Sequence, residues 1–367
     1  MQTSSQRPTV AIIGGGYGGI NAAKALDEHA EVVLIDPSDA FQHSVAALRA
    51  LVDPAVLPRT FLPYDRLLAH GTVLRDRAVE VDSERVVLAS GQVLTPDFVI
   101  LATGSAYPFP GKADRDGREA AIERYRAVYG DLDRAERVLL VGAGAVGLEL
   151  AGEIASFWPD KQVTLLDLAE EILPGPFDPE LRVELRRQLD ALGVRLLLGS
   201  PLTKLPSPAP GTLAAFTVET DAGTEIEADL WLPCFGGVPA TGYLRGDLVG
   251  ARNADGYLAV TAELHLPGHE RIYAIGDISA ADADKASAAG RQAEVVVANI
   301  KAQLAGDAER KTYAAGPASI ILPLGPTGGA GQFPGREGVL TAEFVSELKG
   351  KDMMIGRYAA IMNADQH

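Results

Sequence analysis

The chain has 367 residues, of which 33 are basic and 49 acidic, so its formal net charge is −16. This length allows two or three domains with sizeable cores, and a hydrophobic fraction of 47% is typical of an ordinary globular protein. No strongly basic stretch stands out, which disfavours nucleic acid and anionic membrane surfaces as partners. A single cysteine excludes an internal disulfide and a CxxC redox pair, which fits a reducing compartment.

The N-terminal residues MQTSSQRPT are polar, and no apolar run approaches the length of a membrane span. Position 2 is Gln2 rather than the glycine that N-myristoylation requires. We therefore expect a cytoplasmic protein without an integral membrane segment. Peripheral membrane association and the oligomeric state stay open.

The first recognisable unit is the stretch TVAIIGGGYGGINAAKALDEHAEVVLID at residues 9–36. Residues 10–13 and 31–35 are short and apolar, which predicts buried parallel strands, and a helix is expected at about 18–29. Gly14, Gly16 and Gly19 have G-x-G-x-x-G spacing, which lets the backbone and a helix N-terminus approach a pyrophosphate. Asp36 follows Gly14 by 36 − 14 = 22 residues, where a carboxylate can accept hydrogen bonds from a ribose. Together these features predict a nucleotide-binding βαβ unit.

The next stretch supplies two further places where a cofactor can be contacted. A loop and short helix at residues 41–49 bring Arg49 within possible reach of the cofactor's phosphates. Residues 77–82, 85–89 and 91–94 predict a small antiparallel meander. Residues 98–101 predict a buried strand that ends at Thr103 and Gly104, and open α/β sheets bind ligands at such carboxyl ends. Residues 105–116 predict a linker.

Residues 138–167 repeat the opening unit. An apolar run at 138–141 precedes Gly142, Gly144 and Gly147, and a second apolar run ends on Asp167, at a spacing of 167 − 142 = 25. One chain with two such units is expected to hold two dinucleotides. Asp167 would repel the 2′-phosphate of NADPH, which favours NADH.

The remaining chain predicts a helix at 178–192, strands at 195–198, 214–219, 228–232 and 271–277, and a long helix at about 285–304. Asp277, at the end of the last of these strands, can bond the ribityl hydroxyls of a flavin. Lys285 opposes the dipole of the long helix, which suggests a position near the flavin. Residues 316–367 predict a small third domain with a last helix near 353–362.

In combination, GGGYGG with Asp36, ATG at 102–104, GAGAVGLE at 142–149 and YAIGD at 273–277 resemble the pyridine nucleotide-disulfide oxidoreductase superfamily. The strings FQHSVAALRA, ATGSAYPFPGK, GAGQF and LKGKD are similar to the branch of apoptosis-inducing-factor-like flavoproteins and ferroptosis suppressor proteins, which is related to type II NADH dehydrogenases. The resemblance implies FAD in the outer unit, NAD(P)H in the inner unit and reduction of a quinone-like acceptor. The superfamily's redox-active cysteine pair is absent, as expected for this branch.

The resemblance also implies an α/β fold of two Rossmann-like units with a small C-terminal α+β domain. The expected boundaries are 1–112 with 252–315 for FAD, 113–251 for NAD(H) and 316–367 for the C-terminal domain. The residues predicted to contact FAD are Gly14, Gly15, Gly16, Tyr17, Gly18, Gly19, Asp36, Arg49, Ala78, Thr103, Gly104, Gly276, Asp277 and Lys285. The residues predicted to contact NAD(H) are Gly142, Gly144, Gly147 and Asp167.

Two residues are candidates for catalysis. Glu149 follows Gly147 on the same helix and can face the nicotinamide, although an acid favoured by the helix dipole explains it equally. Lys349 occupies the lysine of the branch's K-x-x-D pattern, with Asp352 as the acid, and can reach the acceptor side of the flavin. An ordinary surface lysine is the other explanation.

No metal site is predicted, because Pro267 and Gly268 break any helix between His265 and His269. Cys234 is interpreted as a small buried hydrophobe. The leading hypothesis is therefore an FAD-dependent NAD(P)H oxidoreductase with a quinone-like acceptor. The alternatives are a ferredoxin or rubredoxin reductase, and a flavoprotein that senses NADH without turnover.

Overall fold

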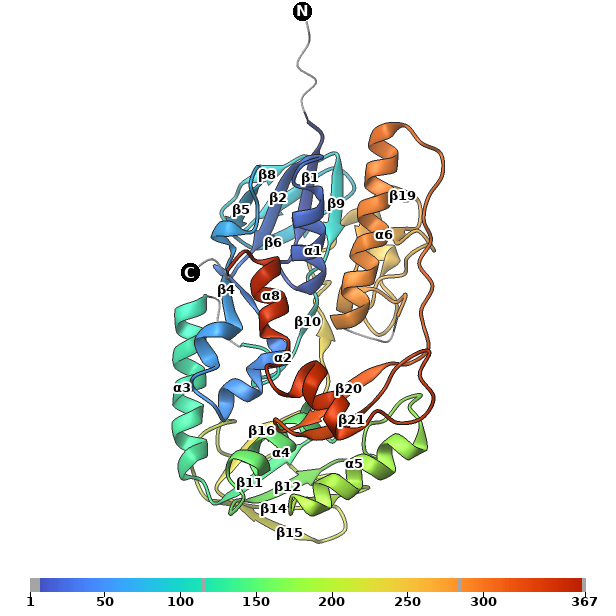
Figure 1. Ribbon diagram of the computed structural model, residues 1–367. Coiled ribbons are helices and arrows are strands. Elements are labelled where there is room, and N and C mark those ends of the chain that lie inside the picture. The colour runs from blue at the N-terminus through green and yellow to red at the C-terminus, as the bar shows by residue number, and fades with distance from the viewer. Residues whose placement is uncertain (1–6, 114–116, 283–285, 365–367) are drawn as a thin grey trace, which may run out of the picture.

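The computed structural model describes residues 7–113, 117–282 and 286–364. Two parallel sheets, each with helices on one face, lie at opposite ends of the molecule (Figure 1). The mixed α/β fold with two Rossmann-like units that the sequence predicts is therefore confirmed.

The larger sheet combines the N-terminal unit with a strand from late in the chain. Its order is β18-β19-β9-β1-β2-β5, with strands His265–Leu266, His269–Ala274, Phe98–Leu101, Thr9–Ile13, Glu31–Asp36 and Thr72–Arg75. All neighbours are parallel except β18 and β19. In β1, Val10 and Ile12 pack toward α1 (Tyr17–Leu26) and α6 (Ala286–Ala305).

The opposite face of the larger sheet is covered by the predicted meander. Ala11 and Ile13 of β1 pack against β6, β7 and β8, because successive side chains of a strand point to opposite faces. These strands span Ala78–Val81, Val86–Leu88 and Val93–Leu94, and they pair antiparallel. After β2 the chain forms β3 (Ala40–Gln42), helix α2 (Ser44–Ala47) and β4 (Phe61–Pro63). Strands β3 and β4 pair antiparallel as a separate two-stranded ribbon.

The smaller sheet has the order β13-β12-β11-β16 and is entirely parallel. Its strands are Arg195–Leu197, Gln162–Leu166, Arg137–Val141 and Leu230–Pro233. Apolar residues of α3 (Arg118–Arg134), α4 (Ala145–Phe157) and α5 (Pro179–Ala191) form the core on one face. The hairpin of β14 (Phe216–Glu219) and β15 (Glu225–Ala228) covers the other face.

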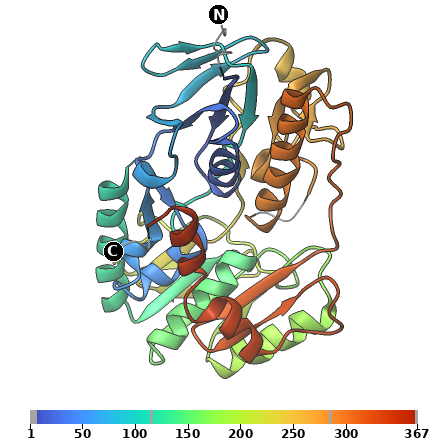
Figure 2. The same ribbon diagram turned by 45° about the horizontal axis from the view of Figure 1, so that its top comes forward.

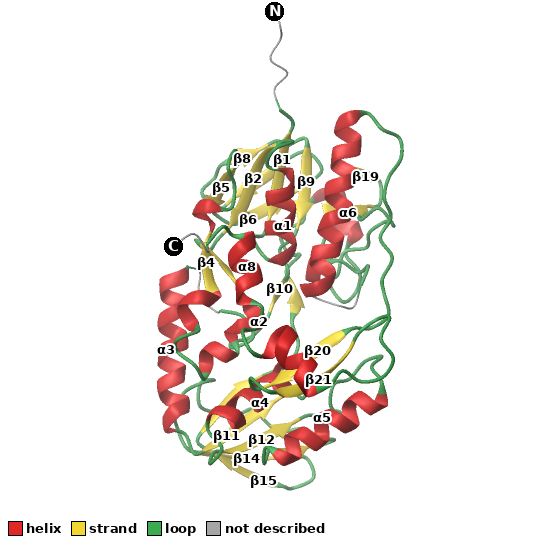
Figure 3. Cartoon of the chain, in the orientation of Figure 1, coloured by secondary structure: helices red, strands yellow, loops and turns green. Residues whose placement is uncertain are grey.

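The segment from residue 316 packs against both units, where it is the red end of the chain in Figure 2 and carries the labels β20, β21 and α8 in Figure 3. The hairpin of β20 (Ile320–Leu324) and β21 (Gly328–Gln332) contributes Leu322 and Leu324 to the core of the smaller sheet's unit. Helix α8 (Ile355–Ile361) and the residues after it contribute Ala359 and Met362 to the core beside α1. The tail thus joins the two units. That it forms a separate domain stays a prediction, and so do the predicted boundaries of the FAD and NAD(H) domains.

Between these ends the tail forms a short helix, α7 (Ala342–Val345), and a π-helical turn at Ser346–Gly350. A second ribbon, β10 (Ser105–Ala106) with β17 (Val238–Pro239), links the two units where the sequence predicts a linker. No helix among residues 7–113, 117–282 and 286–364 is long and apolar enough to cross a membrane.

Candidate functional site

The first glycine turn lies at the carboxyl end of β1 and is built from backbone close approaches. Gly14 has φ 104°, and a side chain there would meet the carbonyl oxygen of Ala102. A side chain at Gly19 would overlap the carbonyl of Gly14, so this glycine sets the distance between α1 and β1. A Cβ at Gly16, by contrast, would have no protein heavy atom within 4 Å. Gly16 therefore faces the space where a phosphate can approach the N-terminus of α1.

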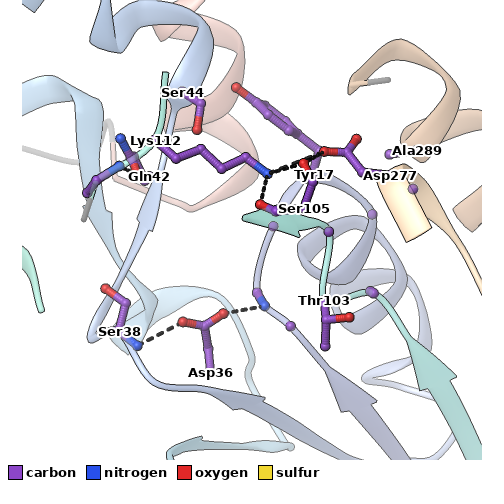
Figure 4. A pocket seen from close by; sticks show the side chains of 18 of the residues that line it. Tyr17, Asp36, Ser38, Gln42, Ser44, Thr103, Ser105, Lys112, Asp277 and Ala289 are labelled. Atoms are coloured by element: carbon purple, nitrogen blue, oxygen red, sulfur yellow. Dashed lines mark hydrogen bonds and ion pairs between the residues drawn. The ribbon is translucent and has the colours of Figure 1, made fainter. Parts of the chain in front are cut away.

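A cavity of about 300 Å³ opens at this turn (Figure 4). At one end, the Asp36 carboxylate accepts hydrogen bonds from the backbone N–H of Gly15 at 2.7 Å and of Ser38 at 2.8 Å. This position at the end of β2 suits a carboxylate that reads ribose hydroxyls. This cavity fits the ADP half of FAD, because it places a wall of glycines, the N-terminus of α1 and the Asp36 carboxylate side by side.

At the other end of the cavity, three polar side chains from separate segments meet. Ser105 Oγ donates to Asp277 Oδ2 at 2.7 Å, and Lys112 Nζ lies 3.3 Å from the same oxygen. Lys112 also donates to the carbonyl oxygen of Ser105 at 2.9 Å. Sequence analysis included Ser105 and Lys112 only within the string ATGSAYPFPGK and did not single them out, because their partner Asp277 lies 172 and 165 residues away in the chain.

Most of the residues predicted to contact FAD line this cavity. They are Gly14, Gly15, Gly16, Tyr17, Gly18, Asp36, Thr103, Gly104, Gly276 and Asp277. Gly19 supports the turn from behind. Ala78 lies in the core between the larger sheet and the meander and does not line the cavity. Lys285 lies outside the described residues.

Arg49 is also absent from the lining, and the structure does not bring it to the cofactor cavity. Its guanidinium is 4% exposed and forms a bidentate ion pair with Glu153 of α4. The prediction that Arg49 contacts phosphates missed this partner, because Glu153 is 104 residues away in the chain.

The second glycine turn repeats the first. Gly142 has φ 110°, and a side chain there would lie 2.7 Å from the carbonyl of Cys234; a side chain at Gly147 would overlap the carbonyl of Gly142. Asp167 accepts from the backbone N–H of Ala143 at 2.5 Å and of Ala169 at 2.8 Å. Gly144, like Gly16, has no protein heavy atom within 4 Å of an added Cβ. The three predicted glycines thus form one turn, and Asp167 is bonded to it through Ala143.

The two candidate catalytic residues lie together, although they are 200 residues apart in the chain. Lys349 Nζ is 2.6 Å from Glu149 Oε1, and their side chains are 12% and 8% exposed. Lys349 also donates to the carbonyl oxygen of Ile321 at 3.1 Å. Burial raises the pKa of Glu149, and the neighbouring Lys349 opposes that rise. A surface lysine is therefore excluded as the description of Lys349.

His43 connects the cofactor cavity with this part of the tail, and sequence reasoning did not single it out. Its Nε2 lies 2.7 Å from the carbonyl oxygen of Met353, and its Nδ1 lies 2.9 Å from the hydroxyl of Tyr17. A carbonyl can only accept, so the neutral ring carries its proton on Nε2 and accepts the Tyr17 hydroxyl on Nδ1. Burial lowers the pKa of His43 to about 4, which keeps the ring neutral near pH 7.

Cys234 lies at the end of β16, beside Gly142, and is buried. Burial raises the pKa of its thiol far above the usual range, so the reactive thiolate is disfavoured. The interpretation of this cysteine as a small buried hydrophobe agrees with that environment.

Comparison with known proteins identifies the family. The profile of the pyridine nucleotide-disulphide oxidoreductase family matches residues 8–293. The chain belongs to this family. It is 36% identical to ferroptosis suppressor protein 1 of Taeniopygia guttata over 95% of this chain and 94% of that protein. It is 33% identical to the Homo sapiens protein of that name, over 89% and 88%, and 27% identical to apoptosis-inducing factor homolog B of Dictyostelium discoideum, over 98% of each.

Solved structures show the same fold. The sulfide:quinone oxidoreductase of Aquifex aeolicus superposes with a TM-score of 0.74 at 16% identity, over 97% of this chain and 92% of that one. A ferredoxin reductase of Rhodopseudomonas palustris gives a TM-score of 0.66 at 21% identity, over 83% and 78%. As a member of the pyridine nucleotide-disulphide oxidoreductase family, this oxidoreductase is a flavoprotein that uses FAD and NAD(P)H.

Proposed function

We propose that this protein oxidises NADH through FAD and passes the electrons directly to a quinone or a similar flat, apolar acceptor. The observation that carries the proposal is the buried Lys349–Glu149 pair, which brings the tail's cation to the helix of the NAD(P)H unit. A lysine held in this way can stabilise negative charge on a reduced acceptor. The sequence contains one cysteine, so a thiol relay within the chain is excluded and the acceptor must approach the flavin itself.

When bound, FAD accepts a hydride from the nicotinamide and gives up electrons to the acceptor. The residues of the chain bind FAD, orient it and place charged groups around it. The turn at residues 14–19 presents backbone N–H groups to the pyrophosphate, and Asp36 orients the ribose. Asp277, held by Ser105 and Lys112, is placed for the ribityl hydroxyls.

The NAD(P)H unit favours the cofactor without a 2′-phosphate. Asp167 directly follows β12 and is itself followed by Leu168, Ala169, Glu170 and Glu171, so the segment offers two further acids and no basic residue to a phosphate. A carboxylate at this position accepts hydrogen bonds from a ribose 2′-hydroxyl and repels a phosphate. We therefore propose NADH as the physiological donor.

The proposal is tested by measuring steady-state NADH oxidation with short-chain quinones, ferricyanide, ferredoxin and oxygen as separate acceptors. We expect saturable turnover with quinones that exceeds turnover with oxygen. Saturable turnover with ferredoxin and none with any quinone would assign the protein to the ferredoxin reductases instead. Slow turnover with every acceptor, together with a long-lived reduced flavin, would favour the NADH sensor.

A further inference from the structure

Four charged side chains are buried together where the two units and the tail meet. Glu149 and Glu153 lie one turn apart on α4, so both point to the same side of the helix. Each receives a cation from another segment: Lys349 from the tail and Arg49 from the 3-10 turn Arg49–Leu51 of the FAD unit. The four side chains are between 0% and 12% exposed. Buried charges of this kind are tolerated only when each has its partner.

Arg49 makes contacts that a lysine in its place could not reproduce. Two of its guanidinium nitrogens, Nε and Nη2, bind the Glu153 carboxylate, the latter at 2.8 Å, and Nη2 also donates to the carbonyl oxygen of Gly350 at 2.8 Å. Gly350 is the residue directly after Lys349. The planar fork of arginine thus ties the backbone beside Lys349 to α4.

The backbone that carries Lys349 is held in uncommon conformations. Lys349 belongs to the π-helical turn Ser346–Gly350, and Met353 and Met354 follow with φ of 54° and 59°. Non-glycine residues with such φ values persist when the surrounding contacts over-determine them. The bonds from Arg49 to Gly350 and from His43 to Met353 are two of those contacts.

Arg49 also determines which acid is available to Lys349. With its carboxylate bound to Arg49, Glu153 does not compete with Glu149 for the lysine ammonium. Without the guanidinium, Glu153 would be a buried, unpaired carboxylate one helical turn from Glu149, the partner of Lys349, and a buried charge without a partner is strongly destabilising. Lys349 already acts on Glu153 through its charge, so it is a cation that can replace Arg49 there.

We propose that Arg49 is a positioning residue, which keeps Lys349 on Glu149 by occupying Glu153 and by fixing the carbonyl of Gly350. It acts on the acceptor step through Lys349, and not as a ligand of the cofactor's phosphates. The role of Lys349 toward the acceptor rests on the proposed function, whereas the pairing of Lys349 does not.

The test uses Arg49→Met, Glu153→Leu and the double variant, each as the full chain loaded with FAD. Replacing a buried ion pair by apolar residues of similar size often preserves stability, so we expect the double variant to melt near the wild type. Arg49→Met is expected to retain flavin and to lose quinone kcat by about 10- to 100-fold, more than it loses in the rate of flavin reduction by NADH. The double variant should recover only part of the quinone kcat, because Glu153 no longer competes for Lys349 but the bond from Arg49 to Gly350 is still missing.

A second readout does not depend on turnover. Labelling of the Lys349 amine by an amine-reactive reagent, followed by peptide mass spectrometry, should be faster in Arg49→Met and in the double variant than in the wild type. The control is Arg137→Met. It removes a guanidinium that is paired with Asp229 at 2.7 Å and lies at the start of β11, the end of that strand away from the second glycine turn. We expect this control to leave the labelling of Lys349 and the quinone kcat unchanged.

Two results would overturn the inference. Loss of flavin from a folded Arg49 variant would make Arg49 a phosphate ligand. Full recovery of the wild-type quinone kcat together with the melting temperature in the double variant would show that the bond to Gly350 does not position Lys349, and the ion pair would be merely structural. If Arg49→Met does not fold, the quinone kcat and the Lys349 labelling of the double variant decide whether Arg49 positions Lys349. If the wild type reduces no quinone, the proposed function fails, and the labelling of Lys349 alone still tests the pairing.

Discussion

The two dinucleotide units have closely similar turns but different helices. In both, the first glycine has a φ near 105–110°, the third meets the carbonyl of the first, and the closing acid accepts a backbone N–H from inside the turn. Seven residues after the first glycine, α1 has Asn21 where α4 has Glu149. Eleven residues after it, α1 has the exposed Ala25 where α4 has the buried Glu153.

The difference between the helices lies in the charged partners that each one binds. The glycine turn is sufficient to place a dinucleotide, and it is the same in both units. The two acids of α4 instead attract cations from the FAD unit and from the tail, and so they join three segments at one buried point. The second helix therefore holds two buried charged partners that the first helix lacks, and the proposed function places one of them, through Lys349, at the acceptor step.

The largest effects on the two units are expected from valine at the middle glycine of each turn. Neither Gly16 nor Gly144 has a protein atom within 4 Å of an added Cβ, so both variants should fold. We expect Gly16→Val to lack FAD, and Gly144→Val to keep FAD but to lose reduction by NADH, because each side chain fills the space of one pyrophosphate. Flavin absorbance and NADH titration distinguish the two, and full flavin in Gly16→Val would refute the assignment of the first turn.

The ion pair between Lys349 of the tail and Glu149 of α4 is tested by Lys349→Ala. Loss of the ammonium should lower quinone kcat by about 10²- to 10³-fold, the effect of removing one preorganised electrostatic contact in a dry site. Lys351→Ala is the matched control, because Lys351 is 58% exposed and pairs with Glu347 on the surface. An unaltered quinone kcat in Lys349→Ala would remove this lysine from the mechanism.

The acid at the end of the second unit is tested by Asp167→Ala. The wild type should show a higher kcat/KM with NADH than with NADPH, and the variant should reduce that ratio by about 10-fold or more, because the carboxylate no longer binds the ribose or repels the phosphate. The corresponding change at Asp36 should affect FAD retention and leave the ratio as it is. A wild-type kcat/KM for NADPH equal to that for NADH would show that Asp167 does not read the ribose.

The contact of the buried His43 with Met353 should make the protein's stability sensitive to acid. The folded protein holds the pKa of His43 at about 4, below the 6.5 of an unperturbed histidine. The unfolded chain therefore binds this proton more readily, and the contribution to stability is present above pH 6.5 and is lost as pH falls toward 4, by about 3 kcal/mol at most. Urea unfolding at pH 7.5 and pH 4.5 should show a smaller acid loss in His43→Gln than in the wild type. Equal losses would contradict the depressed pKa.

The smallest effect is expected at Cys234. Because this thiol is buried beside Gly142, Cys234→Ala should lower the free energy of unfolding by about 1 kcal/mol and leave quinone kcat unchanged. Thiol titration of the native protein should be slow. A large loss of turnover in this variant would give the cysteine a redox role after all.

The parts of the molecule that the sequence predicts well depend on local rules. The glycine turns, the closing acids Asp36 and Asp167 and the meander follow from spacing and periodicity within about 30 residues. Partners such as Glu153 for Arg49, Glu149 for Lys349 and Met353 for His43 lie 104, 200 and 310 residues apart. Such pairs are determined by how the tail packs against both units, which periodicity does not report.

The most direct test of the account is anaerobic double mixing in a stopped-flow spectrometer. The FAD-loaded protein is first reduced with one equivalent of NADH and then mixed with a short-chain quinone. We expect the absorbance of oxidised flavin to return in a single step, at a rate that rises with quinone concentration and is at least as fast as steady-state turnover. Flavin that stays reduced in the presence of quinone, but is reoxidised by an acidic protein carrier or by oxygen, would contradict direct transfer to a quinone.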